Sequence, residues 1–515
     1  MKRIILLILS LVLFLGSIFS FSSCEQIFNP PVSGGNADCI NGNHVDKDED
    51  DCCDACNKYL IVVIDFYTIN DLHGKFCDTD SQPGVDELAS YLKMMESTDD
   101  NSVFLSTGDM WQGTAESNLT GGHILTEWMN EMGFVSMTLG NHEFDWGEDA
   151  IRSNLEIAEF PFLAINVYDV KTNQLADYCT PSVMIERGGI KIGIIGAIGD
   201  CYSSISSDKV EGVTFKVDNQ LTALVKAESD RLRAEGADII VYSLHDGYDS
   251  SSSGSGIITA GNLQSYYSPM LSDGYIDLVF EAHTHQTYTL TDPYGVYHLQ
   301  GGGENKGITH AEVAVNSATG KIRVTEAGFI RSNTYASMPD DPDTEAIEEK
   351  YAEVIDYAYS PLGNVSKYYD DSVVEAKVAE LYLEVGLDKW GEDYDIVLGG
   401  GFLRTRSPYN LERGEVTYAD ILSLLPFDNN IVLCSISGYY LKSKFINSTN
   451  SDYYDYYSSY GNDILGSVSD SEIYYVIVDT YTALYGPNHL TVVDYYDYTT
   501  FARDLLAEAA RNGEL

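Results

Sequence analysis

The stretch Gly140-Asn141-His142-Glu143-Phe144-Asp145 brings together side chains that bind metal ions and move protons. It follows residues 135–139, an apolar run typical of a buried strand, so we expect it on a loop at the carboxyl end of that strand. The amide oxygen of Asn141 can bind a metal ion, and Asp145 can hold the imidazole of His142 in one tautomer. The alternative is a turn with a capping asparagine.

Four further apolar runs end in residues of the same kinds. Residues 60–67 lead to Asp71 and His73, residues 102–107 to Asp109, residues 237–244 to His245, and residues 276–280 to His283 and His285. Five predicted strand ends therefore present Asp, Asn or His, and these loops hold five of the ten histidines. Scattered structural histidines, the alternative interpretation, would rarely gather in this way.

Helical patterns at residues 85–95, 124–132 and 221–235 alternate with these strands and predict an α/β fold. Asp71 and His73 are two residues apart, so in extended backbone both side chains would point the same way and could bind one ion.

The composition limits the kinds of partner. A chain of 515 residues is too long for a single core and implies two or three domains. Lys and Arg number 30 against 79 Asp and Glu, and the net charge of −49 repels nucleic acid and anionic membrane surfaces. An acidic protein that acts on an anionic substrate needs a local positive centre, which bound divalent metal ions supply.

Residues 1–24 have the pattern of an export signal. Two basic residues precede an apolar run at residues 4–21, and small residues come just before Cys24. The end of this run resembles a bacterial lipoprotein signal, in which the cysteine is lipidated, although Phe21 stands where leucine is usual. A retained membrane anchor is the alternative, because 18 residues can just span a bilayer. Both interpretations predict an exported protein.

Eight cysteines follow Cys24, namely Cys39, Cys52, Cys53, Cys56, Cys77, Cys179, Cys201 and Cys434. In an exported protein they can pair as disulfides. Four of them fall within residues 38–57, together with several closely spaced aspartates. We expect a solvated spacer held by disulfides, and a small calcium- or zinc-binding module is the alternative.

The order of the loop motifs resembles the calcineurin-like metallophosphoesterases. Their spacing, with the C-terminal part, resembles the 5′-nucleotidase family, which includes UDP-sugar hydrolases and 2′,3′-cyclic nucleotide phosphodiesterases. The resemblance implies a four-layer α/β/β/α sandwich joined by a helix to a smaller α/β substrate-recognition domain. The domains expected are a signal at residues 1–24, a spacer at 25–57, a metallophosphoesterase domain at 58–336, a linker helix at 337–362 and a substrate-binding domain at 363–515.

The resemblance also implies a role for each loop residue. The first metal would be held by Asp71, His73 and His285, the second by Asn141, His245 and His283, and Asp109 would bridge the two. His142 would be the catalytic histidine that binds no metal, with Asp145 orienting it. Mixed oxygen and nitrogen ligands suit zinc or manganese better than calcium.

The C-terminal part has features of a substrate-binding domain. Prolines flank an acidic helical run at residues 345–359, which predicts an interdomain connector. A predicted strand at residues 396–401 ends in three glycines, which let the backbone approach a ligand closely. Arg404 and Arg406 follow it, and either can pair with a carboxylate or phosphate.

Residues 425–429 resemble a family signature in which the phenylalanine stacks on the nucleobase, so Phe427 is the predicted aromatic clamp. A core aromatic is the alternative. The family's Gly-Gly-Asp-Gly loop is replaced by residues 482–488, where Tyr485, or Tyr481 just before it, would supply the opposing face. The tyrosine-rich residues 453–460 predict a surface hairpin, with carbohydrate contact as the alternative.

The sequence therefore predicts an exported, lipid-anchored monomer at the cell surface or in the periplasm that releases phosphate from nucleotides with two divalent metal ions. Cyclic nucleotides, UDP-sugars and sugar phosphates are alternative substrates. A non-catalytic surface binding protein is the alternative class, and it is disfavoured because no metal-ligand position is lost.

Overall fold

The computed structural model describes residues 39, 42–78, 83–248, 274–401, 410–446, 455–459, 464–486 and 489–515. The predicted export signal with Cys24 lies outside the described residues, as do Arg404 and Arg406. The chain divides into a small unit, Met1–Ile61 with Asn316–Thr319, and a large unit, Val62–Val315 with Gly320–Leu515.

The first sheet of the large unit has the strand order β14-β13-β1-β2-β3-β4 in the described part of the chain. Its strands are β14 (Ile322–Arg331), β13 (Gly307–Asn316), β1 (Ile61–Ile69), β2 (Ser102–Ser106), β3 (Ser136–Thr138) and β4 (Phe162–Leu163). β1 to β4 are parallel, and β13 and β14 are antiparallel to each other. The carboxyl ends of β1, β2 and β3 therefore meet at one edge of the sheet.

The second sheet has the order β11-β12-β10-β9-β7-β6 among the described residues. Its strands are β11 (Thr287–Thr291), β12 (Tyr297–Gly301), β10 (Leu278–Glu281), β9 (Ile239–His245), β7 (Ile190–Ile198) and β6 (Ser182–Arg187). The four central strands are parallel, and both edge strands are antiparallel to their neighbours. β9 is buried along its whole length, which explains its unbroken apolar sequence.

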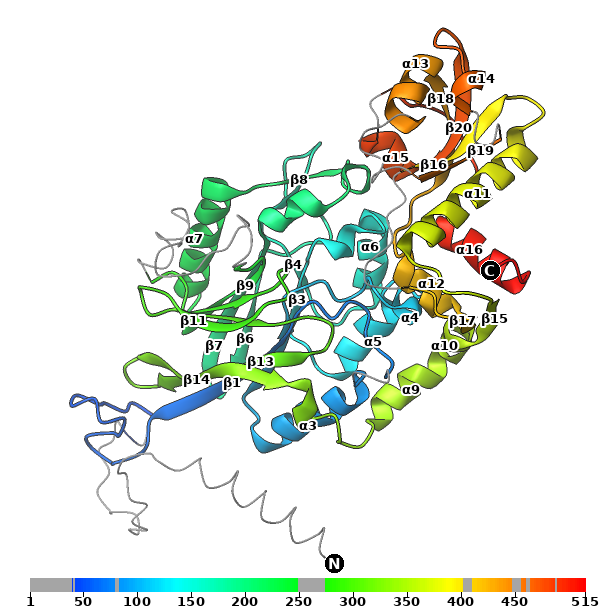
Figure 1. Ribbon diagram of the computed structural model, residues 1–515. Coiled ribbons are helices and arrows are strands. Elements are labelled where there is room, and N and C mark those ends of the chain that lie inside the picture. Colours follow the sequence, from blue (N-terminus) through cyan, green and yellow to red (C-terminus); the bar gives the residue numbers. More distant parts are fainter. Residues whose placement is uncertain are drawn as a thin grey trace, which may run out of the picture. The chain divides into compact units, whose positions relative to one another are not determined.

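The two sheets pack face to face. Phe66 and Leu105 of the first sheet share a core with Val241 and Phe280 of the second, and the rings of Phe66 and Phe280 lie 6.2 Å apart. Helices α3 (Asp86–Thr98), α5 (His123–Glu131) and α6 (Glu148–Ile157) cover the first sheet, and α7 (Asp218–Ala234) covers the second (Figure 1). This arrangement confirms the predicted four-layer α/β/β/α sandwich.

The connecting segment that we expected to form a single helix forms two. These are α9 (Pro342–Lys350) and α10 (Ala352–Tyr359), with Tyr351 in a non-helical conformation between them. Asp341 caps α9 by accepting a hydrogen bond from Thr344 N at 3.0 Å, and it also accepts one from Lys93 Nζ of α3 at 2.8 Å. The start of the connector is thus fixed to the sandwich.

The C-terminal part contains a smaller α/β arrangement. Its sheet has the order β19-β16-β20-β18-β21 within the described residues, with β19 (Asp455–Ser458), β16 (Ile396–Gly401), β20 (Ile473–Asp479), β18 (Ile431–Ser437) and β21 (Thr491–Tyr495). Helix α11 (Asp371–Trp390) covers one face of this sheet (Figure 1). The described part of the tyrosine-rich segment is β19, an antiparallel edge strand beside β16.

The small unit contains the aspartate- and cysteine-rich segment. Asp46 accepts hydrogen bonds from Asp51 N at 3.1 Å and from Asn316 Nδ2 at 2.7 Å. The expectation of disulfides was wrong, because all eight described cysteines are free thiols. The Sγ atoms of Cys39 and Cys53 lie 3.7 Å apart, whereas a disulfide bond measures about 2.05 Å.

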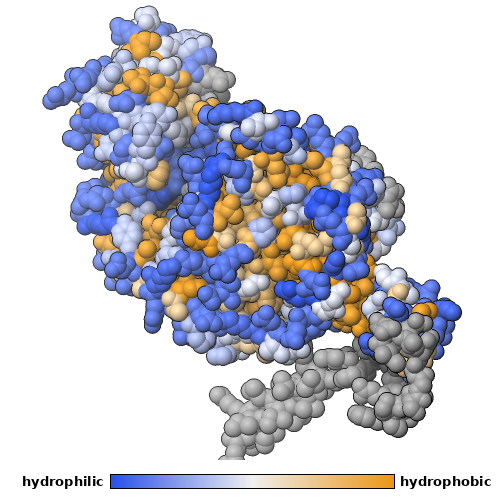
Figure 2. All heavy atoms as spheres, turned by 180° about the vertical axis from the view of Figure 1, so that it is seen from behind, coloured by the Kyte–Doolittle hydropathy of each residue, from blue (hydrophilic) through white to orange (hydrophobic). Residues whose placement is uncertain are grey.

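No helix in the ranges that the structure describes is long and apolar enough to cross a membrane. Figure 2 shows one face of the molecule, on which hydrophilic residues surround more apolar areas.

Candidate metal centre

The predicted metal ligands all lie on loops at the carboxyl ends of parallel strands. Asp71 and His73 follow β1, Asp109 follows β2, Asn141 follows β3, His245 ends β9, and His283 and His285 follow β10. Strands of both sheets therefore contribute to one site, and the structure brings all seven side chains together there. Asp71, His73 and His285 place possible ligand atoms within 4.8 Å of one another, and so do Asp71, Asp109 and His245.

Two histidines are held so that one ring nitrogen faces the centre. His73 Nδ1 lies 2.9 Å from the carbonyl oxygen of Gln112, and His245 Nδ1 lies 2.6 Å from that of Thr107. A carbonyl oxygen only accepts, so each Nδ1 donates, and in the neutral ring each Nε2 carries a lone pair. Such a second hydrogen bond commonly orients a metal-bound histidine.

Each Nε2 atom lies close to further potential metal-ligand atoms. His73 Nε2 lies 3.0 Å from His285 Nε2. His245 Nε2 lies 3.1 Å from Asp109 Oδ2 and 3.3 Å from Asn141 Oδ1. Lone pairs this close repel unless a proton or a cation lies between them. The residues therefore fit divalent metal ions, and their mixture of nitrogen and oxygen donors suits zinc or manganese.

The electrostatics of the centre also favour bound cations. Asp71 and Asp109 are both buried. Burial raises the pKa of Asp71 to about 7, and the nearby charge of Asp109 acts in the same direction. Burial lowers the pKa of His245, but Asp109 outweighs this effect and raises it to about 10. The protein thus creates a buried negative potential that stabilises positive charge.

The ligand loops have unusual backbone conformations. Positive φ angles occur at Asp71 (50°), His73 (51°), Asp109 (54°), His283 (68°) and His285 (52°). The expectation of extended backbone at Asp71 and His73 was therefore wrong: both residues are left-handed, and their side chains converge because of that turn. A left-handed non-glycine residue costs of order 1 kcal/mol, and such residues are often found clustered at functional sites.

Glu143 is a residue of the site to which the sequence pattern assigned no role. It is fully buried, and its carboxylate accepts hydrogen bonds from the backbone nitrogens of Asp109 at 2.9 Å, Met110 at 2.8 Å and Gly140 at 2.7 Å. It therefore joins the loops that follow β2 and β3. Its position inside the Gly140–Asp145 motif was the available signal, but its partners are set by tertiary structure.

Asn70 is a second buried residue that the pattern missed. Its Nδ2 donates to Asp71 Oδ2 at 2.6 Å, and its Oδ1 accepts from Gly301 N at 3.0 Å. The side chain thus positions the Asp71 carboxylate. Asp71 also accepts from His283 N at 3.0 Å, which links the loops of the two sheets.

His142 and Asp145 form a pair beside the ligand cluster. His142 Nδ1 lies 2.7 Å from Asp145 Oδ2, and His142 N donates to Asp109 Oδ1 at 2.8 Å. Burial lowers the pKa of His142, but Asp109 and Asp145 outweigh this effect and raise it to about 9. With Nδ1 occupied by Asp145, Nε2 is the ring atom left to act on a bound molecule.

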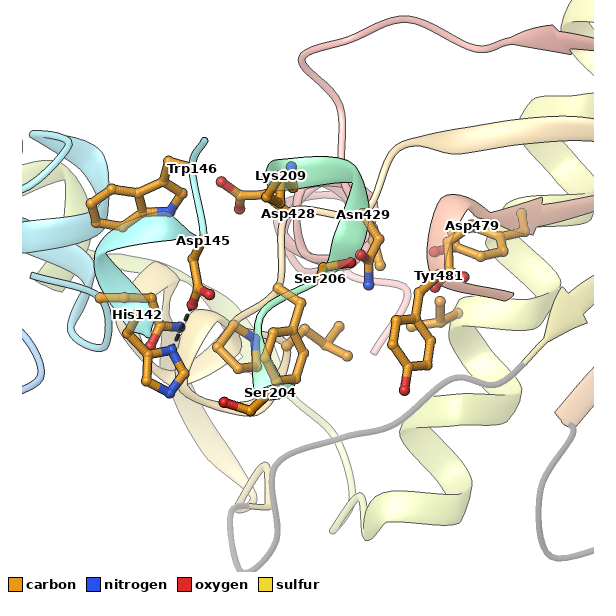
Figure 3. A pocket seen from close by; sticks show the side chains of 17 residues that line it. His142, Asp145, Trp146, Ser204, Ser206, Lys209, Asp428, Asn429, Asp479 and Tyr481 are labelled. Carbon is orange, nitrogen blue, oxygen red and sulfur yellow. Dashed lines mark hydrogen bonds and ion pairs between the residues drawn. The ribbon is translucent and has the colours of Figure 1, made fainter. Parts of the chain in front are cut away.

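A cavity of about 340 Å³ opens beside His142. Gln112 and Asp145 of the sandwich line it together with Phe427 and Tyr481 of the C-terminal part. Figure 3 shows His142 and Asp145 on one side and Tyr481 on the other. Its size falls within the range of small-molecule sites.

The predicted substrate residues occupy different places. Phe427 lines the cavity and is 49% exposed, so it is not a core aromatic. Tyr485 lies outside the cavity lining, and its hydroxyl accepts a hydrogen bond from Ser207 N at 3.0 Å. Arg404 and Arg406 are outside the described residues.

Arg503 holds the loop that carries Phe427. It is buried, pairs with Asp428 and donates to the carbonyl oxygen of Phe427 at 3.3 Å. Its Nε also donates to Tyr418 Oη at 3.1 Å. The exposed aromatic ring is thus presented by a loop with a fixed backbone.

Comparisons with known proteins agree with this geometry. Residues 64–287 match the model of the calcineurin-like phosphoesterase family. An apyrase of Tabanus yao is 26% identical over 416 residues, which cover 73% of this chain and 72% of that protein. A 5′-nucleotidase of Vibrio parahaemolyticus is 22% identical, covering 72% of this chain and 71% of that protein. The crystal structure of a 5′-nucleotidase precursor from Thermus thermophilus superposes with a TM-score of 0.59 at 18% identity, covering 88% and 96% of the two chains, and shares the fold.

Proposed function

We propose that this chain, a metal-dependent phosphoester hydrolase, releases phosphate from extracellular nucleotides. The match of residues 64–287 to the calcineurin-like phosphoesterase model and the similarity to 5′-nucleotidases support this proposal. The export pattern at residues 1–24 supports a location outside the cytoplasm, with lipid on Cys24 as the anchor.

The observation that carries the proposal is the convergence of seven potential metal ligands beside the His142–Asp145 pair. One ion would be held by Asp71, His73 and His285. A second ion would be held by Asn141, His245 and His283, and Asp109 would bind both ions. Two bound divalent cations would orient the phosphoryl group, lower the pKa of the attacking water and neutralise charge during displacement.

His142 would act on the leaving group. Asp145 holds Nδ1, so the Nε2 proton is available to the departing ribose oxygen or to an equatorial phosphoryl oxygen. The pKa of about 9 keeps this proton in place at neutral pH in the protein without metal. An alkoxide is a poor leaving group, so proton donation at this atom accelerates the step most for unactivated esters.

The cavity beside His142 would take the nucleoside. Phe427 and Tyr481 supply aromatic faces for a base, and Asn429 and Ser206 supply hydrogen-bonding groups in the same lining. Lys209 also lines the cavity, and its ammonium would favour an anionic substrate in this acidic protein.

A cyclic nucleotide or a UDP-sugar would use the same metal ligands and the same aromatic faces. The replacement of the family's glycine-rich loop by residues 482–488 is the sequence feature that leaves these alternatives open. They are distinguished by the substrate panel below. A non-catalytic surface protein would keep the cavity and hydrolyse no member of the panel.

The test is hydrolysis of AMP, UDP-glucose and 2′,3′-cyclic AMP by the purified protein with manganese or zinc, alongside metal analysis. AMP hydrolysis is measured as released phosphate, UDP-glucose hydrolysis as UMP and glucose 1-phosphate, and cyclic AMP hydrolysis as the ring-opened adenosine monophosphate. We expect the wild-type protein to hydrolyse AMP. Asp109→Ala should lose both bound metal and turnover, whereas His142→Ala should keep its metal and lose only turnover. An absence of phosphate release from AMP at full metal loading would overturn the proposal, and hydrolysis of UDP-glucose or cyclic AMP alone would assign the corresponding alternative activity.

A further inference from the structure

A second group of metal-ligating atoms lies in the small unit. Cys39, His44, Cys53 and Cys56 each offer one ligand atom, and all four atoms lie within 4.8 Å of one another. The Sγ atoms of Cys39 and Cys53 are 3.7 Å apart, and Cys56 Sγ is 3.5 Å from His44 Nδ1. None of these residues belongs to the catalytic cluster.

These separations match the edges of a tetrahedral zinc site. With Zn–S bonds of about 2.3 Å and a Zn–N bond of about 2.0 Å, tetrahedral angles put two sulfurs roughly 3.8 Å apart and a sulfur and a nitrogen roughly 3.5 Å apart. Three thiols and one imidazole are also a complete ligand set for structural zinc.

We propose that Cys39, His44, Cys53 and Cys56 bind one structural Zn²⁺ ion. The site is closed, because four protein ligands leave no position for a substrate. Its role is to fix the fold of the segment that precedes the catalytic domain.

The backbone around Cys53 forms a turn that brings Cys53 and Cys56 close together. Cys53 N donates to Lys58 O at 2.9 Å, and Asn57 N donates to Cys53 O at 2.8 Å, so residues 53–57 form a tight turn. Asn57 has a φ of 57°, which closes that turn. Cys53 and Cys56 thus come from one turn, in the two-residue spacing common among zinc ligands, and Cys39 and His44 come from the preceding segment.

The small unit needs a cross-link such as a bound zinc ion because its apolar core is small. The described residues up to Ile61 include only three buried hydrophobic side chains, those of Cys52, Cys53 and Leu60. Modules of this size are commonly stabilised by disulfides or a metal ion. A disulfide would use two of the three thiols, leave the third unpaired and give His44 no role.

Metal analysis of the full-length protein tests the proposal. We expect Asp109→Ala to lose the ions of the catalytic centre, as in the proposed function, so one equivalent of zinc per chain should remain. The zinc X-ray absorption spectrum of this variant should contain sulfur scatterers at about 2.3 Å. This measurement needs no substitution in the small unit and does not depend on any catalytic activity.

The paired variant Cys53→Ser/Cys56→Ser tests the ligands in the otherwise unchanged chain. We expect it to lose one equivalent of zinc and to retain phosphate release, which reports the folding of the catalytic domain. Cys77→Ser removes a partly buried thiol outside the cluster and should change neither the zinc content nor the rate of phosphate release. The proposal is overturned if the paired variant keeps all its zinc, if the zinc in Asp109→Ala has no sulfur ligands, or if thiol counting of the isolated protein shows these cysteines oxidised to disulfides.

Discussion

The carboxylate of Glu143 accepts a hydrogen bond from the backbone nitrogen of Asp109 at 2.9 Å. The same side chain accepts from Met110 N and Gly140 N, so one buried group fixes both loops on which a bridged pair of metal ions would depend. Burial raises the pKa of Glu143 to about 7, with Asp109 acting in the same direction. These backbone donors, and any cations at the centre, favour its charged form.

Glu143→Gln should weaken metal binding about 10- to 100-fold. The NH₂ group of the glutamine would replace one carboxylate oxygen and cannot accept hydrogen bonds from the backbone N–H groups of the two loops. The measurement is metal affinity by competition with a chelator. Glu186→Gln on the exposed face of β6 is the matched control and should bind as the wild type does. Equal affinities of wild type and Glu143→Gln would contradict the positioning role.

His142→Asn should reduce kcat for AMP by about 10²- to 10⁴-fold at unchanged metal content, because the proton donor to the leaving oxygen is lost. The loss should be much smaller with p-nitrophenyl phosphate, whose phenolate leaves without protonation. Asp145→Asn should show the same pattern more weakly, since Asp145 acts through His142. Equal losses on both substrates would show that His142 is not a proton donor.

Phe427→Ala and Tyr481→Ala should each raise KM for AMP. Stacking on a base contributes about 1–3 kcal/mol, which corresponds to roughly a 5- to 160-fold increase in KM. Neither variant should change KM for an alkyl phosphate that carries no base. Tyr485→Ala tests the other predicted aromatic face, which lies outside the cavity lining but packs against Tyr481 with the ring centroids 4.9 Å apart, so we expect a smaller increase in KM. An increase with Tyr485→Ala alone would transfer the clamp to that residue.

The charge of Asp341 should stabilise the connection between α3 and α9. Burial raises the pKa of Asp341, but Lys93 and the Thr344 backbone nitrogen outweigh this effect and hold it below its usual value. A lowered carboxylate pKa contributes stability above the unfolded pKa of about 4 and loses it as the pH falls through the folded pKa. Asp341→Asn keeps a capping side chain but removes the charge.

We therefore expect Asp341→Asn to lower the free energy of unfolding by about 1 kcal/mol at pH 7, with the difference from wild type closing below about pH 4. Thermal unfolding at pH 7 and pH 3 measures it. Asp343→Asn is the control, because this second partner of Lys93 is 62% exposed and contributes about 0.5 kcal/mol or less. A difference that widens in acid would contradict the assignment.

Much of the sandwich could be predicted from sequence, because buried parallel strands give unbroken apolar runs. The apolar runs before Asp71, Asp109 and His245 predicted the strands β1, β2 and β9, and the metal-ligating side chains lie at the carboxyl ends of these strands. The left-handed backbone at Asp71 and His73 could not be predicted, because it depends on hydrogen bonds to distant loops such as Asp71 N to Gly108 O.

Contacts between distant segments account for the rest of what the sequence missed. Glu143 and Asn70 carry no pattern that reveals their partners. Tyr481 and Tyr485 lie one helical turn apart on α15 (Thr480–Tyr485), and their ring centroids are 4.9 Å apart, but only Tyr481 lines the cavity. Which of the two rings reaches the cavity depends on how α15 is placed, and the sequence pattern does not specify that. The break at Tyr351 occurs within a continuous helical pattern.

The central claim is that two metal ions share Asp109 at the carboxyl ends of the parallel strands of both sheets. Anomalous diffraction from crystals grown with manganese tests it most directly. We predict two peaks about 3.5–4 Å apart, one beside Asp71, His73 and His285 and one beside Asn141, His245 and His283, with Asp109 between them. A structure at full manganese loading with no peak at these residues, or with a single peak that Asp109 does not touch, would contradict the account.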